Sequence, residues 1–249
     1  MQNANINGPT KPVGMRKRKL YESHKYSNQF FWEVMPNGAW EGHPAVIVGG
    51  GPNIPPDFNW KSLHRFRTIS TNRAFEKFDP TITFSMDPRF LMWVKSNRYG
   101  EAVHERFARL STYRVWLVTY VAHLPPECYV IPVFQSYDAG LRTFSDDMTK
   151  GLGHGNNSGY AALNLAFVLG ADPIYLLGFA MNHKPNRVSH WHSGHPIPQE
   201  EHTVKSFIPA FNMAAEKIKE KGRRVINLSA EEETDLRCFP IQPIKEVLK

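Results

Sequence analysis

The 249-residue sequence has little cysteine: it contains only Cys128 and Cys238, and these two lie far apart. A disulfide framework or a cysteine-based zinc site needs more cysteines at closer spacing, so both are excluded, and the scarcity is typical of a reducing compartment. No run reaches the roughly 18 apolar residues of a membrane span. The polar start MQNANINGPTKPVG also lacks the apolar core of a signal peptide. We therefore expect a cytoplasmic protein without a membrane span.

Acidic residues are fewer than basic ones. Asp and Glu total 23 against 30 Lys and Arg, which gives a net charge of +7. This balance favours an anionic ligand or partner, such as a nucleotide, a phosphorylated sugar or nucleic acid. Part of the charge lies in KPVGMRKRKLYESHK, residues 11–25. We interpret that segment as a solvated tail, with contact to an anionic partner as the alternative.

Short apolar segments alternate with helical patterns from residue 45 onward. Seven segments are rich in β-branched and aromatic residues, as expected for parallel strands buried on both faces: 45–50, 67–72, 81–87, 113–120, 128–134, 173–179 and 223–229. Helices are expected within 89–110 (interrupted near Gly100), 158–171 and 200–222 (broken or kinked at Pro209). The alternation predicts an α/β fold, Rossmann-like, with a mostly parallel doubly wound sheet and helices on both faces.

This organisation predicts three parts. Residues 1–28 are expected to be a basic, flexible N-terminal tail and residues 231–249 a C-terminal tail. Between them, residues 29–230 would form a single Rossmann-like nucleotide-binding transferase domain, in which residues 180–202 are a candidate lid. No internal repeat or low-complexity linker divides that domain.

The first candidate site is the turn GGGPN, directly after the strand AVIV. It lacks the lysine of a P-loop and the helix start of a dinucleotide-binding fingerprint. Glycine amides in a turn can nevertheless cradle a phosphate, and open α/β sheets bind ligands at the carboxyl ends of their strands. The turn therefore predicts nucleotide binding by Gly49, Gly50, Gly51, Pro52 and Asn53. A tight turn without a ligand is the alternative.

The next two predicted strands also end in polar residues. Asn72 and Arg73 follow the second strand, where the amide suits a base or ribose edge and the guanidinium suits a phosphate. A capped loop would explain them equally well. Asp87 ends the third strand, and its carboxylate there would hold a metal or a hydroxyl. Three polar strand ends at one sheet edge indicate a ligand more strongly than any one of them.

A second glycine-rich segment, GLGHGNNSG, leads into the helix expected at 158–171. The free N–H groups and the positive dipole end of a helix N-terminus attract phosphate. Asn157 and Ser158 would line that end, with Ser158 as the N-cap and Gly170 just beyond the C-terminus. Capping alone would also explain Ser158.

Three histidines, His190, His192 and His195, lie in VSHWHSGHP. Their spacing lacks the cysteine or carboxylate signature of a zinc site. Imidazole titrates near neutrality, which suits a general base acting on a substrate hydroxyl. We expect a histidine base here, with a metal site as the alternative.

The order of these motifs resembles a loose superfamily of bacterial and archaeal proteins. It is carried by GGGP after a strand, TNRAF after the next, NSGYAALNLAFVLGADPIYLLGF, and SHW before an amphipathic helix. The superfamily joins the family 42 bacterial sialyltransferases to the DUF115, or MptE-like, proteins. It includes flagellin-modifying motility accessory factors and archaeal 6-hydroxymethylpterin diphosphokinases. The resemblance covers about residues 44–229.

In the sialyltransferases the matching turn, asparagine and Ser-Gly contact the CMP part of CMP-sialic acid, and the histidine of the Ser-His-aromatic motif is the general base. The resemblance implies nucleotide binding by Gly49, Gly51, Pro52, Asn72, Ser158 and Gly159, with His190 as the base. The sequence departs from the family pattern at four places. Gly50 replaces a polar residue, Ala180 an aspartate, Asn182 and His183 the tyrosines that assist the departing phosphate, and Gly155 stands near a missing arginine.

Three hypotheses follow from the residues and the resemblance. The first is a glycosyltransferase that uses a nucleotide-activated sugar and an unspecified acceptor, with His190 as base and no required cofactor. The second is a diphosphokinase with Mg²⁺-ATP in the same cleft and Asp87 on the metal. The third, favoured by Ala180 and the missing tyrosines, is a non-catalytic nucleotide-binding or structural protein whose site has decayed.

Overall fold

The structure is a computed structural model that describes residues 29–118, 124, 127–133, 144–182, 190–192 and 201–249. The expected N-terminal tail and most of the candidate lid lie outside these residues. Within them, no helix is both long enough and apolar enough to cross a membrane.

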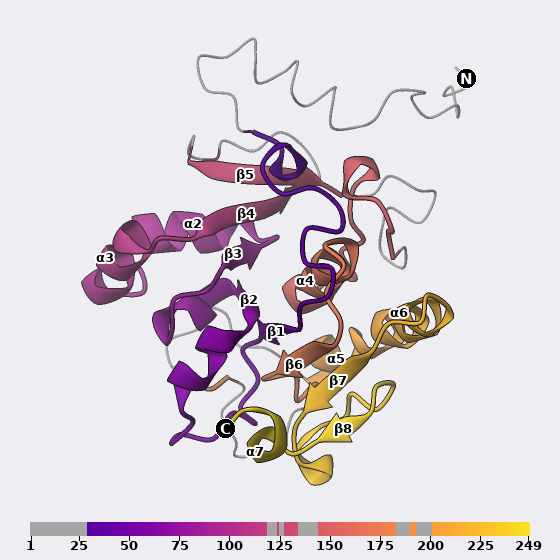
Figure 1. Ribbon diagram of the computed structural model, residues 1–249. Coiled ribbons are helices and arrows are strands. Elements are labelled where there is room, and N and C mark those ends of the chain that lie inside the picture. Colours follow the sequence, from indigo (N-terminus) through magenta and orange to yellow (C-terminus); the bar gives the residue numbers. More distant parts are fainter. Residues whose placement is uncertain (1–28, 119–123, 125–126, 134–143, 183–189, 193–200) are drawn as a thin grey trace, which may run out of the picture.

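One sheet of eight strands forms the centre of the molecule (Figure 1), in the order β5-β4-β3-β2-β1-β6-β7-β8. The strands are β1 (Ala45–Val48), β2 (Arg67–Thr71), β3 (Ile82–Ser85), β4 (Tyr113–Val118), β5 (Cys128–Pro132), β6 (Ile174–Leu177), β7 (Val225–Leu228) and β8 (Ile241–Gln242). Every neighbouring pair is parallel. The predicted Rossmann-like sheet is confirmed, and its strand order reverses at β1, between β2 and β6.

Helices cover both faces of this sheet (Figure 1). The α-helices are α2 (Pro88–Lys95), α3 (Glu101–Arg109), α4 (Ser158–Val168), α5 (Glu201–Lys205), α6 (Ile208–Glu220) and α7 (Ile244–Val247). The 3₁₀ helices are η1 (Phe31–Glu33), η2 (Trp60–Arg65), η3 (Asn72–Glu76), η4 (Met148–Lys150) and η5 (Glu231–Glu233). Alternate residues of β1 enter different cores: Ile47 packs in the core with α4 and α6, and Val48 in the core with η2 and α7. This is the doubly wound arrangement that the sequence predicts.

Helix α4 is the central helix of one face. It packs on β1, β2, β3 and β6, and Gly159–Val168 are all buried. Gly170 adopts a left-handed φ of 88° just beyond its end, and the N–H of Ala171 donates to Ala166 O at 3.1 Å, which is the Schellman arrangement. Because a crossover helix runs antiparallel to the strands that it joins, the N-terminus of α4 lies at their carboxyl edge.

Two helix boundaries differ from the sequence-based expectation. The N-cap of α4 is Asn157, not Ser158, because the Asn157 side chain accepts the N–H of Tyr160 at 3.0 Å. The helical segment at 200–222 consists of α5 and α6, and it breaks before Pro209. That proline lies in the first turn of α6, where its missing N–H would have no intrahelical partner anyway.

Residues 231–249 are not a tail. They form η5, β8 and α7, and Leu236 and Phe239 are buried in the same core as α4. Backbone bonds fix this addition, since Asn227 N donates to Pro240 O at 2.8 Å and Ser229 N to Gln242 O at 3.0 Å. A two-residue strand carries too little periodicity to be predicted, but the parallel edge of β7 provides its partners.

Candidate functional site

A cavity opens at the carboxyl edge of the sheet, at the point where the strand order reverses. Open α/β sheets bind their ligands at this position. Residues after β1, β2, β3 and β6 line it together with the start of α4, the end of α2 and two histidines. Of the twelve predicted site residues, all but Asn53 line this one cavity.

The glycine turn after β1 lies against the turn after β6. Gly49 N donates to Leu177 O and Gly51 N to Gly178 O, both at 2.8 Å. A Cβ atom on Gly49 or Gly51 would lie 2.6 or 2.5 Å from Gly178 O, so only glycine allows this approach. Two of the three glycine amides are therefore used inside the fold. Among the described residues, only the Gly50 amide of the three has no acceptor.

The segment His190–His192 is fixed across this turn by its central tryptophan. Trp191 N donates to Gly50 O at 3.1 Å, and Trp191 Nε1 donates to Gly49 O at 2.9 Å. The flanking rings of His190 and His192 stack 4.9 Å apart and both line the cavity. A Cβ on Gly50 would lie 2.8 Å from His190 Cδ2. The absence of a side chain at Gly50 thus makes room for the imidazole of His190.

Asn53 lies behind the cavity wall rather than in it. Its Nδ2 donates to Ser229 Oγ at 3.0 Å, and its Oδ1 is buried without a hydrogen bond in the described part of the chain. This contact connects the turn after β1 to the end of β7. We therefore assign Asn53 to the support of the turn.

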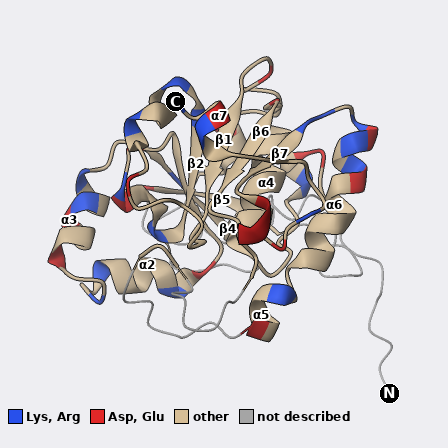
Figure 2. Cartoon of the chain, turned by 90° about the horizontal axis from the view of Figure 1, so that it is seen from below, with Lys and Arg blue, Asp and Glu red and all other residues tan. Residues whose placement is uncertain are grey.

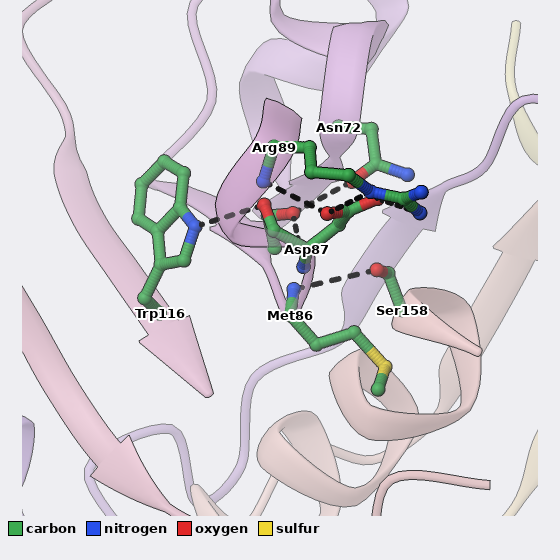
Figure 3. A network of polar contacts seen from close by, with 7 residues as sticks. Asn72, Met86, Asp87, Arg89, Trp116 and Ser158 are labelled. Carbon is green, nitrogen blue, oxygen red and sulfur yellow. Dashed lines mark hydrogen bonds and ion pairs between the residues drawn. The ribbon is translucent and has the colours of Figure 1, made fainter. Parts of the chain in front are cut away.

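Asn72 lines the cavity from the end of β2. Its φ of 49° lies in the left-handed region, which asparagine tolerates better than most residues. Asn72 Oδ1 accepts the Ser85 hydroxyl at 2.8 Å, and Figure 3 shows the amide nitrogen turned away from Asp87. Thr71 Oγ1 donates to Val48 O at 3.0 Å and holds this strand end against β1. The hydrogen bond from Ser85 thereby fixes the orientation of the Asn72 amide in the cavity lining.

Arg73 is buried, and much of its charge is balanced inside the protein. It forms an ion pair with Glu76, with Nη2 and Oε2 3.0 Å apart, and its guanidinium lies 4.6 Å from the centre of the Tyr99 ring. An arginine with a carboxylate partner and an aromatic partner attracts an anion less strongly than a solvated one does. Its predicted phosphate contact stays a prediction.

Asp87 caps helix α2 (Figure 3). Its Oδ1 accepts the backbone N–H of Arg89 at 2.8 Å, and its Oδ2 lies 2.9 Å from Arg89 Nη2. The same hydrogen bond and charge raise the pKa of Arg89. Mg²⁺ needs oxygen ligands that are not already paired with a cation. In the described part of the chain no group of three or more His, Cys, Asp or Glu could hold a metal ion. These residues do not fit a magnesium site.

The first turn of α4 presents unused donors to the cavity. Asn157 caps the amide of Tyr160, whereas the amides of Ser158 and Gly159 have no acceptor among the described residues. Ser158 Oγ accepts the N–H of Met86 at 3.4 Å (Figure 3), which connects α4 to the end of β3. A Cβ on Gly159 would lie 2.6 Å from the Phe179 ring, so glycine allows α4 to approach the β6 turn. This helix end has the donors and the dipole of an anion site.

Several lining residues were not predicted from the sequence. Phe90, Trp93 and Tyr99 form an aromatic wall on the α2 side. Burial raises the pKa of Tyr99 to about 12, with a smaller opposing effect of Arg73. Met181, after β6, has a φ of 48°, which is unusual for a residue other than glycine or asparagine and is typical of functional loops. The turn sequence SNRYG after α2 was the one available signal for Tyr99.

Comparison with solved structures finds bacterial sialyltransferases. Sialyltransferase CstII from Campylobacter jejuni with cytidine-5'-monophosphate shares 14% identity (TM-score 0.49, 84% of this chain and 88% of that chain). CstII with CMP-3FNeuAc shares 16% (TM-score 0.49, 83% and 88%), and CST-II with a trisaccharide acceptor and CMP shares 13% (TM-score 0.48, 83% and 88%). The sequence matches no protein-family model and no curated protein. The resemblance to DUF115 proteins therefore stays a prediction.

Proposed function

We propose that this protein is a nucleotide-binding transferase whose ligand phosphate lies at the N-terminus of α4. The observation that carries the proposal is the pair of amides on Ser158 and Gly159, which line the cavity without an acceptor in the described part of the chain. Uncapped amides at a helix start, with the positive end of the helix dipole, favour an anion. The net charge of +7 favours the same kind of ligand.

The remainder of the cavity suits the nucleoside part of such a ligand. The amide nitrogen of Asn72 can donate to a base or ribose edge, and Phe179 and Tyr99 provide apolar surface. Ligand cavities commonly combine a mainly apolar lining with a few fixed polar groups of this kind.

The reaction that we propose is glycosyl transfer from a nucleotide-activated sugar. The acceptor oxygen forms a bond to the anomeric carbon, and the bond from that carbon to the phosphate oxygen of the nucleotide breaks. His190 takes the proton from the acceptor hydroxyl. The amides of the α4 first turn stabilise the charge that develops on the leaving phosphate. Each of these residues lines the same cavity.

The binding step is tested by a thermal-shift screen of CMP, CDP, UDP, GDP and ATP. At 100 times its Kd a ligand adds about 2.7 kcal/mol to the free energy of unfolding, or about 5–11 °C in Tm for a chain of this size. The decisive variant is Ser158→Pro. It removes one amide N–H at the first helical position, where proline is favoured, and the extended backbone of Asn157 (φ −144°, ψ 125°) is compatible with a following proline.

Ser158→Ala is the matched control, since it keeps the amide and loses the same hydroxyl. A hydrogen bond to a charged group contributes about 1.5–3 kcal/mol, so Ser158→Pro should weaken nucleotide binding about 10- to 100-fold relative to Ser158→Ala. Equal affinities in the two variants, or no shift with any nucleotide, would overturn the proposal. For a nucleotide that binds, the transferase hypothesis further requires that sugar transfer to an acceptor is lost in His190→Ala.

A further inference from the structure

Trp191 is the one residue of the segment His190–His192 that does not line the cavity. It makes two hydrogen bonds to the turn after β1: its backbone N–H donates to Gly50 O at 3.1 Å, and its indole Nε1–H donates to Gly49 O at 2.9 Å. One residue therefore holds two consecutive carbonyl groups of the turn. Hydrogen bonds are directional, so two of them from one residue fix the orientation of the segment as well as its place.

The indole ring of Trp191 has further contacts outside the cavity. It packs on the core that contains Val48, and its centre lies 5.9 Å from the centre of the Trp60 ring in η2 and 5.7 Å from Lys77 Nζ. Strands β1 and β6, whose turns meet here, contain no Lys, Arg, Asp or Glu (Figure 2). The hydrogen bonds of Trp191 thus attach the segment to neutral backbone groups, and salt does not screen them as it screens ion pairs.

The imidazoles on either side of Trp191 both place Nε2 near the glycine turn. A Cβ on Gly50 would lie 2.8 Å from His190 Cδ2, 3.7 Å from His190 Nε2 and 3.8 Å from His192 Nε2. The two imidazoles stack at 23°, and the His192 ring meets the indole of Trp191 edge to face with their centres 4.9 Å apart. The position of the His190 ring over Gly50 therefore depends on the residue that holds this stack on the turn.

We propose that Trp191 is a positioning residue for the general base, because its two hydrogen bonds to the turn hold the His190 imidazole in the cavity lining. The proposal rests on the proposed function, since it takes His190 as the base. A base must lie within hydrogen-bond reach of the proton that it removes, and a displacement of about 1 Å can cost about 100-fold in rate. Trp191 would therefore raise kcat without touching either substrate.

The first measurement follows the imidazole stack by NMR without any ligand. In protein with isotope-labelled histidine, a nuclear Overhauser effect between the rings reports the stack, and H190A and H192A assign the signals. We expect this effect in the wild type. W191F keeps an aromatic ring and the backbone N–H but loses the indole N–H, so the effect should be lost. W60F is the control, because it trims the neighbouring indole and leaves both bonds to the turn in place. It should keep the effect.

The second measurement is the rate of nucleotide release from CMP-sialic acid and from UDP- and GDP-activated sugars, with water as the acceptor. W191F should lower kcat about 10- to 100-fold and leave the nucleotide Kd within about twofold, because Trp191 does not line the cavity. W60F should keep the wild-type kcat. In the H190A background W191F should have no further effect, since it acts only through His190.

The proposal is overturned if W191F keeps the ring-to-ring effect or the wild-type kcat, if W60F loses both, or if W191F slows H190A further. If the wild type releases nucleotide from none of the sugars, the proposed function fails by itself, and the ring-to-ring effect alone then decides the role of Trp191. Should W191F not fold, G50A crowds the same imidazole, since its Cβ would lie 2.8 Å from His190 Cδ2, and it should lose both signals. A wild-type effect and rate in G50A would overturn the proposal.

Discussion

Two glycine-rich segments meet at the cavity, and they are glycine-rich for different physical reasons. In the turn Gly49–Gly51, the backbone of the β6 turn approaches so closely that a Cβ on Gly51 would lie 2.5 Å from Gly178 O. In the segment Gly151–Gly159, side chains hold the backbone: Asn164 Oδ1 accepts the N–H of Gly153 at 2.9 Å, and Asn157 caps α4.

The difference decides which segment can bind an anion. The first turn uses two of its three glycine amides in backbone bonds to the β6 region, whereas the start of α4 leaves two amides without an acceptor among the described residues. Glycine content alone indicates a phosphate cradle equally in both cases. What distinguishes them is where the N–H groups are used, and this depends on strand neighbours that are distant in sequence.

The largest expected effect is a loss of stability in Gly51→Ala, which disturbs the contact between the turn after β1 and the turn after β6. The added Cβ would overlap with backbone atoms that cannot rotate away, so we expect a loss of about 3 kcal/mol in the free energy of unfolding. The Tm should fall by about 6–12 °C. Gly222→Ala is the control, because Gly222 has a φ of 67° but nothing within 4 Å, and only its backbone strain of about 1 kcal/mol should appear. Equal Tm values in the two variants would contradict the crowding argument.

Sequence patterns were sufficient to predict the strands and helices in which apolar residues recur at a regular spacing over several residues. All seven predicted strands are present, and the interruption near Gly100 separates α2 from α3 as expected. The patterns were insufficient where a long-range contact decides. Asn53 was predicted to bind a ligand because it neighbours the glycines, but its side chain is directed to Ser229, 176 residues away in sequence.

The aromatic residues that line the cavity show the same limit of sequence-based prediction, because here functional residues were missed. In the sequence, Trp93 and Tyr99 are typical of the apolar face of a helix and of a turn. Trp93 lines the cavity from α2, and the chain reversal at Asn97 brings Tyr99 back beside it. The polar strand ends, by contrast, were predictable, since parallel strands bring their carboxyl ends to one edge regardless of detail. Asn72 and Asp87 do line the cavity, although Asp87 is used there as a helix cap.

The side-chain support of the second segment is tested by Asn157→Ala and Asn157→Asp. Loss of the cap in Asn157→Ala should cost about 1 kcal/mol, or about 2–4 °C in Tm. Asn157→Asp keeps a capping oxygen and should keep the wild-type Tm. Its negative charge should nevertheless weaken nucleotide binding by about 1 kcal/mol, which is about fivefold in Kd. Asn156→Asp is the control, because it places the same charge on an exposed neighbour outside the cavity lining.

Those variants are measured by thermal unfolding and by nucleotide titration. We expect the two Asn157 variants to change stability and nucleotide affinity independently. The side-chain cap uses the amide of Tyr160, whereas the proposed anion uses the amides of Ser158 and Gly159. An Asn157→Asp variant that binds nucleotide as tightly as the wild type would place the phosphate away from this helix end.

The smallest expected effect is an acid dependence at Asp147, the N-cap of η4, which precedes the second segment in the chain. Burial alone would raise the pKa of Asp147, but hydrogen bonds from Asn37 and Thr149 and the charge of Lys150 hold it below its ordinary value. A carboxyl whose pKa is depressed in the folded state contributes stability above its unfolded pKa, near 3.9, and loses it as the pH falls through the folded value. Asp147→Asn keeps the hydrogen-bond acceptor and removes only the charge.

At pH 7 this variant should be less stable by about 0.5 kcal/mol, because a partly exposed carboxylate contributes little. Thermal unfolding of both proteins between pH 7 and pH 3 should show the difference shrinking below about pH 4, where the wild-type carboxyl becomes protonated. A difference that stays constant down to pH 3 would mean that the charge of Asp147 contributes nothing. The chain that leads into α4 would then be held by neutral hydrogen bonds. It would differ from the turn after β1 only in which groups form those bonds, side chains in one case and backbone in the other.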